Sequence, residues 1–237
     1  SIGVHLLNLL ALPAIVLVYY FRKFEFSWKG FLISIAVSCA ILAVLIWGII
    51  PGIVKISSRI DLFFVNTLKL PPNSGMIVHF IILAVLFVVA IRLSLNSENR
   101  IKNAAAAIAA LFLTGIWVVA DSGFLNVLVL AVVSAFLWYT AGKSRVLLNT
   151  ILTAVVVILI GYSSTAIIVI RASANPPLNE NNPSDPFNLL YYLNREQYGD
   201  RPLFYGPYYN APVLDYADGK PVYVLEDNKK YIITHRE

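Results

Sequence analysis

The chain has 237 residues, of which 59% are hydrophobic and 13% are charged, and its formal net charge is +5. Soluble domains are roughly 45–50% apolar and about 25% charged, so this composition excludes an ordinary soluble enzyme, and it also excludes intrinsic disorder. The single cysteine excludes an intrachain disulfide.

Six apolar runs follow one another in the first 170 residues. They cover residues 2–21, 31–50, 76–93, 104–120, 123–141 and 146–170. Each is long enough to cross a hydrocarbon core about 30 Å thick, and none alternates as the strands of a transmembrane barrel would. The sequence therefore predicts an all-α transmembrane helical bundle of about six spans, with Pro51-Gly52 ending the second.

The short connections predict how this bundle is oriented. The connections after the first, third and fifth runs, together with the last turn of the third run, carry eight basic residues, namely Arg22, Lys23, Lys29, Arg92, Arg100, Lys102, Lys143 and Arg145. The other connections carry only Lys55, Arg59 and Lys69. Because basic loops stay on the cytoplasmic side, we expect the segment after residue 170 on the outer face.

The connection between the second and third runs has its own pattern. Apolar residues recur at helical spacing between residues 53 and 64, with Lys55, Arg59 and Asp61 among them. This spacing predicts an amphipathic helix lying in the membrane interface, ended by Pro71-Pro72. A helix packed on the bundle as a cap is an equally weighted alternative.

The last 67 residues differ in composition from the bundle. The net charge is +7 up to residue 170 and −2 from residue 171 onward. Asp185 stands where an N-cap would, before Pro186, so we predict a helix over 186–197 that is closed by Gly199.

Short β-prone runs follow this predicted helix. Residues 222–225 and 231–234 are expected to pair as a hairpin across residues 226–230, and Asp218-Gly219 is a further turn candidate. The predicted domains are thus the bundle, residues 1–170, and a small α+β extracytoplasmic tail, residues 171–237. We expect this tail to be the start of a truncated soluble domain.

No catalytic or metal-binding residue is assigned from the sequence. There is no phosphate-binding glycine loop and no HExxH motif, and His5, His79 and His235 do not share metal-ligand spacing. The basic residues border the membrane, so nucleic-acid binding is rejected. His5, Asn8, His79 and Asn126 are polar groups in or near apolar runs, where an interhelical hydrogen bond is favoured over a functional role.

The stretch from residue 189 to 209 carries the most chemistry. Its charged residues lie among tyrosines, and the candidate substrate-binding residues are Arg195, Glu196, Tyr198, Asp200 and Arg201. Tyrosine rings can stack on sugars, and arginine pairs with phosphate. Composition alone slightly favours the alternative, a tyrosine belt at the membrane surface with ordinary salt bridges.

Three pieces of the tail carry a resemblance to a known family. They are RASANPP (171–177), ENNP (180–183) and YLNREQYGDRPLFYG (192–206), and the strong match covers about a fifth of the chain. The chain resembles a large bacterial family of multi-spanning membrane proteins that is related to the eukaryotic transmembrane O-mannosyltransferases. The five candidate residues match that family's motif, and the resemblance gives them no individual role.

The resemblance implies a C-type glycosyltransferase of the bacterial inner membrane, with its tail in the periplasm. Such an enzyme moves a sugar from a polyprenyl-phosphate donor to Ser or Thr of an exported protein. In that superfamily the acidic catalytic residue lies in the first outer loop. No matching motif occurs here, and we expect it upstream of Ser1. No cofactor is implied with certainty, and a divalent metal stays open.

The expected partners follow from this reading. They are the lipid bilayer, a polyprenyl-phosphate sugar, an exported acceptor protein and an envelope complex. Lys55 and Arg59 are the candidate residues for holding the lipid carrier at the membrane surface. Two alternatives remain: a transporter or flippase for lipid-linked sugars, and a non-catalytic subunit of an envelope complex.

Overall fold

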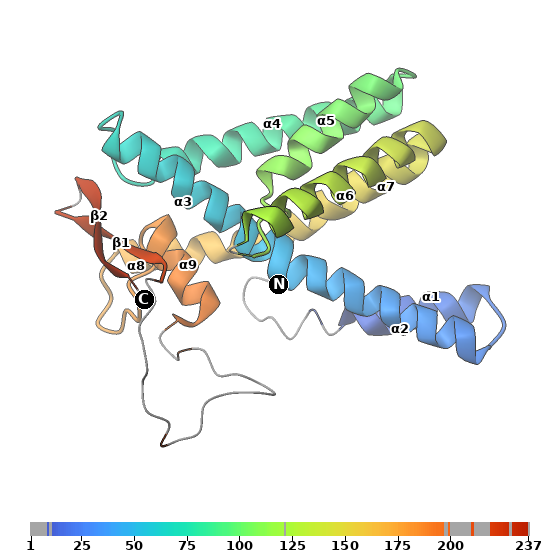
Figure 1. The fold of residues 1–237 in the computed structure, drawn as a ribbon, viewed down its shortest axis with the longest axis horizontal. Helices are drawn as coiled ribbons and strands as arrows, with labels where there is room; N and C mark the ends of the chain where they lie inside the picture. Colours follow the sequence, from blue (N-terminus) through green and yellow to red (C-terminus); the bar gives the residue numbers. More distant parts are fainter. Residues whose placement is uncertain are drawn as a thin grey trace.

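The computed structural model describes residues 9, 11–120, 122–196, 199, 210, 219–227 and 229–236. In these residues the chain is mainly helical and ends in a two-stranded sheet (Figure 1). The elements in chain order are α1 (Ala11–Lys23), α2 (Trp28–Ala43), the π-helical segment η2 (Val44–Ile49), α3 (Ile50–Asn66), α4 (Ser74–Asn96), α5 (Arg100–Leu113), α6 (Gly123–Lys143), α7 (Arg145–Tyr162), the 3-10 turn η3 (Ser163–Thr165), α8 (Ala166–Ser173), α9 (Pro186–Asn194), β1 (Pro221–Glu226) and β2 (Lys230–Arg236).

Four helical stretches are long and apolar enough to cross a membrane. They are Trp28–Asn66, Ser74–Asn96, Gly123–Lys143 and Arg145–Ser173. The prediction of membrane helices is therefore confirmed, whereas the count of about six spans is not. The described part of α1 has 13 residues and α5 has 14, and both fall short of the roughly 17 residues that a crossing needs.

Polar caps at the helix starts fix where these helices begin. The side chains of Ser27, Asn99 and Ser144 each accept a hydrogen bond from a backbone N–H in the first turn of α2, α5 and α7. Such caps satisfy N–H groups that have no partner inside the helix. The connections before α2, α5 and α7 can therefore be short, and the helices return through the bundle as antiparallel neighbours.

The prediction that Pro51-Gly52 ends the second helix is wrong. α2, η2 and α3 form one helix of 39 residues, Trp28–Asn66. Proline has no N–H to donate to the preceding turn, and the wider π turn just before it changes the pairing, so that the N–H of Ile50 donates to the carbonyl of Leu45. At 1.5 Å per residue this helix is about 58 Å long, so α3 continues beyond what a single crossing requires.

Two glycines let the helix Trp28–Asn66 pack closely against the turn that ends α5. Gly52 lies against Gly115 so closely that a Cβ on either residue would clash with the backbone of the other. Gly115 has a φ of +70°, which glycine adopts at little cost. The helix expected over 104–120 therefore stops at Leu113, and the chain turns across α3 instead of continuing.

The amphipathic helix predicted after the second apolar run is present as α3. Its apolar face is buried against α4 and α9, which is the packing that the cap alternative describes. The polar residues Ser57, Ser58 and Asp61 of α3 are buried as well.

His79 shows how a polar group inside the bundle is satisfied. Its Nδ1 lies 2.7 Å from the hydroxyl of Ser57, and its Nε2 lies 2.9 Å from the carbonyl oxygen of Leu113. Both ring nitrogens are thus used by contacts to α3 and α5, as the interhelical alternative predicts. His5 and Asn8 lie outside the described residues.

The local predictions for the tail are largely confirmed. Asp185 caps α9 by accepting from the N–H groups of Phe187 and Asn188, and β1 pairs antiparallel with β2 across the predicted turn. α9 ends at Asn194, earlier than expected, because Arg195 adopts a left-handed conformation at its C-cap. Asp218 lies outside the described residues.

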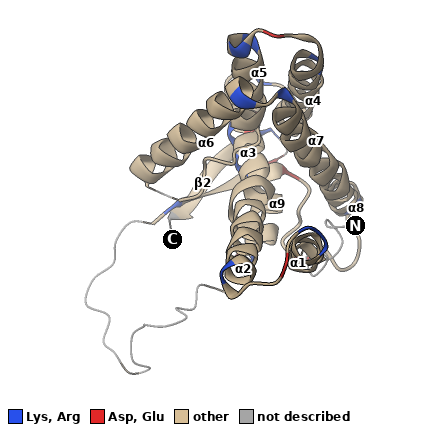
Figure 2. Cartoon of the chain, turned by 90° about the vertical axis from the view of Figure 1, so that its right-hand side faces the viewer, with Lys and Arg blue, Asp and Glu red and all other residues tan. Residues whose placement is uncertain are grey.

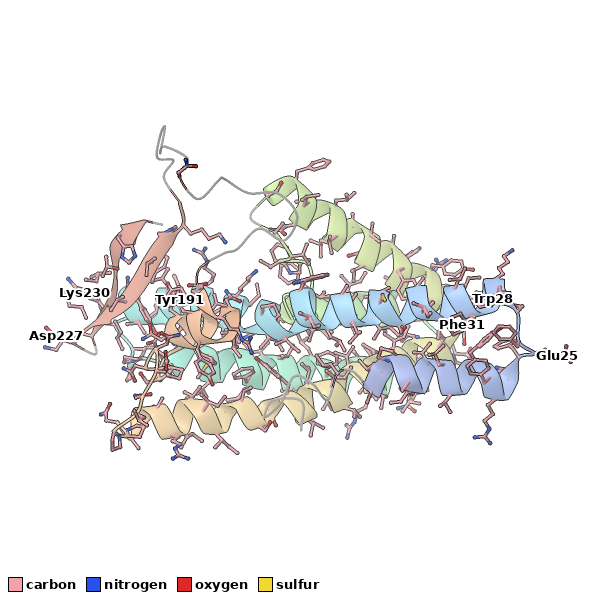
Figure 3. The ribbon with its side chains drawn as sticks, turned by 90° about the horizontal axis from the view of Figure 1, so that it is seen from below. Glu25, Trp28, Phe31, Tyr191, Asp227 and Lys230 are labelled. Atoms are coloured by element: carbon pink, nitrogen blue, oxygen red, sulfur yellow. The ribbon has the colours of Figure 1, made fainter. Side chains whose placement is uncertain are left out.

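The tail and the basic connections lie at opposite ends of the molecule. Glu25, in the connection between α1 and α2, and Trp28, the first residue of α2, are at one end, and Tyr191 and Lys230 are at the other (Figure 3). Figure 2 looks onto the first of these ends and shows lysines and arginines at the helix connections. The predicted orientation, with basic connections on the cytoplasmic side and the tail on the outer face, requires that these two parts lie at opposite ends of the fold.

Candidate functional site: a basic pocket between the third helix and the tail

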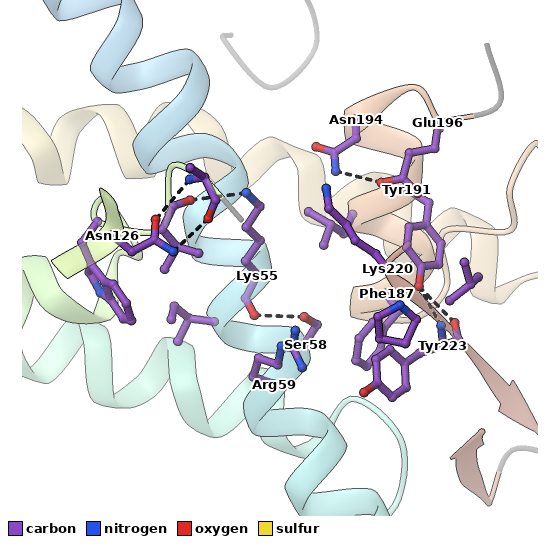
Figure 4. A pocket seen from close by; sticks show the side chains of 17 residues that line it. Lys55, Ser58, Arg59, Asn126, Phe187, Tyr191, Asn194, Glu196, Lys220 and Tyr223 are labelled. Atoms are coloured by element: carbon purple, nitrogen blue, oxygen red, sulfur yellow. Dashed lines mark hydrogen bonds between the residues drawn. The ribbon is translucent and has the colours of Figure 1, made fainter. Parts of the chain in front are cut away.

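A pocket of about 430 Å³ opens where α3, the connection from α5 to α6, α9 and β1 meet (Figure 4). Its lining residues are Lys55, Ile56, Ser58, Arg59, Trp117, Val118, Ala120, Asn126, Phe187, Leu190, Tyr191, Asn194, Glu196, Lys220, Pro221, Val222 and Tyr223. The volume lies within the range of small-ligand sites. Segments far apart in sequence thus form one concave surface at the tail side of the bundle.

The α3 wall supplies two basic side chains one helical turn apart. Lys55 and Arg59 share a helix face because residues four apart lie above one another. The Lys55 ammonium donates to the carbonyl oxygen of Val118 at 3.3 Å, and the Arg59 guanidinium lies 6.0 Å from the ring centre of Tyr223. The two residues proposed to hold a lipid carrier therefore face a common cavity.

The opposite wall is aromatic and is fixed by hydrogen bonds between α9 and β1. The Tyr191 hydroxyl accepts from the backbone N–H of Tyr223 at 2.8 Å. The ring of Phe187 lies 4.7 Å from that of Tyr223. These contacts hold the first strand against α9, so the aromatic surface is part of the packed structure.

Asn126 shapes the third wall. Its side-chain oxygen accepts from the N–H groups of Val119 and Ala120 at 3.1 Å, and its amide donates to the carbonyl oxygen of Ala120 at 2.8 Å. This residue therefore organises the connection before α6, which its position in an apolar run did not indicate.

The pocket is electropositive by its side chains. Lys55, Arg59 and Lys220 are basic, and Glu196 is the acidic residue among the lining side chains. The Glu196 carboxylate accepts from the side-chain amide of Asn194 at 3.0 Å. Basic groups beside aromatic rings can bind a phosphate together with an apolar or sugar moiety.

The structure brings three of the sequence-predicted site residues into this pocket: Lys55, Arg59 and Glu196. Arg195 is exposed and is not among the lining residues. Tyr198, Asp200 and Arg201 lie outside the described residues. The convergence of α3 with the end of α9 depends on tertiary packing, so sequence spacing alone did not join the two groups.

A second polar cluster lies beside the pocket and was missed by the sequence reasoning. Asp61 is fully buried, and its carboxylate accepts from the N–H groups of Asn73 and Gly75 and from the hydroxyl of Tyr231. Both carboxylate oxygens therefore have donors. The cluster joins α3, the start of α4 and β2.

Asp185 is the other buried carboxylate of this region. Burial raises its pKa from 3.8 to about 6, against the opposing effect of the N–H groups of Asn188 and Phe187. Burial, with the nearby carboxylates Asp185 and Asp61, also raises the pKa of the Tyr231 hydroxyl. These groups are already used for capping and docking, so they are poor candidates for a catalytic base.

A metal site is not apparent in the parts of the chain that the structure describes, where no three His, Cys, Asp or Glu side chains gather.

Comparison with protein-family models, with curated proteins and with solved structures finds no match for this chain.

Proposed function

We propose that this chain is the membrane part of a C-type glycosyltransferase. It moves a sugar from a polyprenyl-phosphate donor to Ser or Thr of exported proteins at the outer face of a bacterial inner membrane. The pocket between α3 and the tail receives the phosphate and sugar of the donor. The proposal rests on the tail motifs and, above all, on Lys55 and Arg59 facing an aromatic wall in one cavity.

The electrostatics of the pocket suit a phosphate. Lys55 and Arg59 come from α3, and Lys220 comes from the segment before β1, so cationic groups approach from two sides. In a transfer reaction the departing lipid phosphate gains negative charge, which positioned cationic groups stabilise. The arginine adds the option of a two-pronged hydrogen bond to phosphate oxygens.

The location suits a donor that is partly lipid. α3 belongs to the continuous apolar helix Trp28–Asn66, and its buried face packs on the membrane helix α4. A lipid tail in the bilayer can therefore extend away from a phosphate held at Lys55. The rings of Tyr191 and Tyr223 then offer surfaces for the sugar. The proposed reaction also needs a base that takes the proton of the acceptor hydroxyl. We do not assign this role to any residue of the pocket.

Donor binding tests the proposal. The protein in lipid nanodiscs is titrated with undecaprenyl phosphate and, separately, with undecaprenol, which lacks the phosphate. We expect the wild type to prefer the phosphate at least tenfold. The variant Lys55→Gln/Arg59→Gln should lose that preference, because it removes both α3 cations.

Lys69→Gln is the matched control. Lys69 follows α3, is exposed and donates to the carbonyl oxygen of Asn66, and it does not line the pocket. It should bind both lipids as the wild type does. An undiminished phosphate preference in the double variant would remove the pocket from the proposed mechanism.

A further inference from the structure

Two basic residues lie next to each other at the end of the bundle opposite the tail. Arg100 is the first residue of α5 and Lys143 is the last residue of α6, and the connections that they border lie far from β1 and β2 (Figure 1). The Arg100 guanidinium crosses Gly142, where an added Cβ would lie 2.6 Å from its Nε. Because Gly142 directly precedes Lys143, these three residues form one site, which we call the α5–α6 corner.

Aromatic residues of α6 hold both cations in place. The Arg100 guanidinium lies 4.6 Å from the ring centre of Trp138, and its Nε and Nη2 donate to the carbonyl oxygen of Trp138 at 3.2 and 3.1 Å. The Lys143 ammonium lies 5.4 Å from the ring centre of Tyr139 and donates to its hydroxyl at 3.1 Å. Arginine has five N–H donors and lysine has three. These contacts therefore position the two cations without using all their donors.

The positive charge of the corner is not neutralised within the described part of the chain. Glu98, which precedes Arg100 by two positions, pairs with Arg145 at 3.5 Å. Neither Arg100 nor Lys143 forms an ion pair with a carboxylate of the described residues. Two positioned cations without an anionic partner favour the binding of an anion from outside the chain.

An exposed apolar stripe on α6 leads to this corner. Val132, Phe136 and Tyr139 are 61%, 51% and 56% exposed. Lys143 continues their spacing of three and four residues, so it lies on the same helix face. This helix is the candidate membrane span Gly123–Lys143. In a bilayer the stripe therefore faces lipid tails, and Lys143, at the end of the span, lies at the level of the head groups.

We propose that the α5–α6 corner binds the head group of an anionic phospholipid, with one acyl chain along the stripe on α6. The phosphodiester of such a lipid is negative and has two unsubstituted oxygens, which accept from the remaining donors of Arg100 and Lys143. Basic residues at the ends of membrane helices attract anionic lipids for this reason. A zwitterionic lipid brings a positive group to the same corner, so it binds less tightly.

Competition between two lipids tests the charge preference. The purified protein in detergent is mixed with equal amounts of phosphatidylglycerol and phosphatidylcholine that have the same acyl chains, and native mass spectrometry identifies the retained lipid. Since each cation contributes about fivefold, we expect at least a tenfold preference for phosphatidylglycerol. Arg100→Gln/Lys143→Gln should lose this preference.

A second double variant controls for the loss of two charges. Arg22 and Lys29 are exposed and border the connection between α1 and α2, at the same end of the molecule. Arg22→Gln/Lys29→Gln changes the net charge by the same amount and leaves the α5–α6 corner intact. It should keep the preference of the wild type.

Gly142→Ala tests the geometry of the corner at constant charge. The added Cβ meets the side chain of Arg100, which can move away, so the variant should fold. The displaced guanidinium should then lower the preference for phosphatidylglycerol about fivefold. Gly123→Ala, also on α6, has no atom within 4 Å of the added Cβ and should behave as the wild type. Circular dichroism checks the fold of each variant.

A water-soluble phosphate tests whether the lipid tail takes part. sn-Glycerol 3-phosphate carries a phosphate and no acyl chain, so a large excess of it should leave phosphatidylglycerol bound. Displacement by this compound would overturn the proposal. So would a wild type without preference, the same preference in Arg100→Gln/Lys143→Gln or in a folded Gly142→Ala, or equal losses in the two double variants.

This lipid site is independent of the proposed glycosyl transfer. Lys55→Gln/Arg59→Gln changes the pocket at the tail end and should keep the preference for phosphatidylglycerol. Arg100→Gln/Lys143→Gln should in turn keep the preference for undecaprenyl phosphate over undecaprenol. Loss of both preferences in one of these variants would indicate an effect of overall charge and would overturn the α5–α6 corner as a specific site.

Discussion

The hydroxyl of Tyr231 donates a hydrogen bond of 2.8 Å to the carboxylate of Asp61, although the two residues are 170 positions apart in the chain. Tyr231 belongs to the last strand and Asp61 to α3, so this bond ties the tail to the bundle. A buried carboxylate is costly unless it is hydrogen-bonded. The contact therefore makes the tail part of the packing of α3, whose Lys55 and Arg59 line the basic pocket.

Removing the Tyr231 hydroxyl should loosen the hairpin. In Tyr231→Phe one oxygen of Asp61 loses its side-chain donor, and we expect a loss of about 1.5–3 kcal/mol in the free energy that docks the tail. Hydrogen exchange of β1 and β2 measures this as faster exchange. Tyr223→Phe, on the partner strand, keeps its ring contact with Phe187 and serves as the control. Equal protection in the two variants would contradict the docking role of the bond.

The buried Asp185 should make the stability of the folded tail depend on pH. Its pKa rises from 3.8 to about 6 on folding because burial disfavours the charged form. The folded state thus binds the proton more tightly, so this group contributes stability below about pH 4, and the contribution is lost as pH rises toward 6. At 1.36 kcal/mol per pKa unit the contribution is about 3 kcal/mol.

The variant Asp185→Asn isolates this titration, since asparagine also caps a helix and carries no charge. Thermal unfolding of wild type and variant is compared between pH 4 and pH 7, and the variant should gain relative to the wild type as pH rises. Glu180→Gln, an exposed carboxylate of the same tail, should follow the wild type throughout. A constant difference between wild type and Asp185→Asn would contradict the assigned pKa.

The close contact of Gly52 with Gly115 should tolerate no side chain. Gly52→Ala places a Cβ against the backbone of the turn after α5, and overpacking of this kind costs about 1–3 kcal/mol. Thermal unfolding in detergent measures the loss. Gly161→Ala, where no other atom lies within 4 Å of the added Cβ, should be neutral or stabilising because alanine favours helix. An equally stable Gly52→Ala would show that α3 and the turn can separate at no cost.

Lys220 should contribute to donor binding although the sequence did not single it out. It lines the basic pocket next to β1 and is exposed, so we expect Lys220→Gln to weaken undecaprenyl phosphate binding about threefold. Lys229, in the turn of the same hairpin, lies outside the pocket, and Lys229→Gln should bind as the wild type does. Equal losses in both variants would indicate only a general effect of charge.

The elements that the sequence predicted best are those with strong local signals. The Asp185-Pro186 pair predicted the start of α9, and two short β-prone runs on either side of a turn predicted the hairpin, because caps and turns depend on neighbouring residues. The long apolar runs predicted membrane helices for the same reason. These features needed no knowledge of the tertiary packing.

The features that were mispredicted or missed depend on contacts between distant segments. A proline such as Pro51 normally ends a helix. Here the π turn before it changes the backbone pairing, and Gly52 packs closely against Gly115, so that the helix continues through both residues. Asp61 matched the polar face of an amphipathic helix, yet the start of α4 and Tyr231 bury it. The presence of Lys55 and Glu196 in the lining of one pocket likewise depends on the packing of α9 on α3.

Glycopeptide mass spectrometry of envelope proteins is the most direct test of the central claim. Cells that lack this protein are compared with cells that express the wild type or Lys55→Gln/Arg59→Gln. We predict hexose-modified Ser and Thr peptides that disappear in the deletion, return with the wild type and fall at least tenfold with the double variant. An unchanged set of glycopeptides in the deletion strain would contradict the proposed glycosyl transfer.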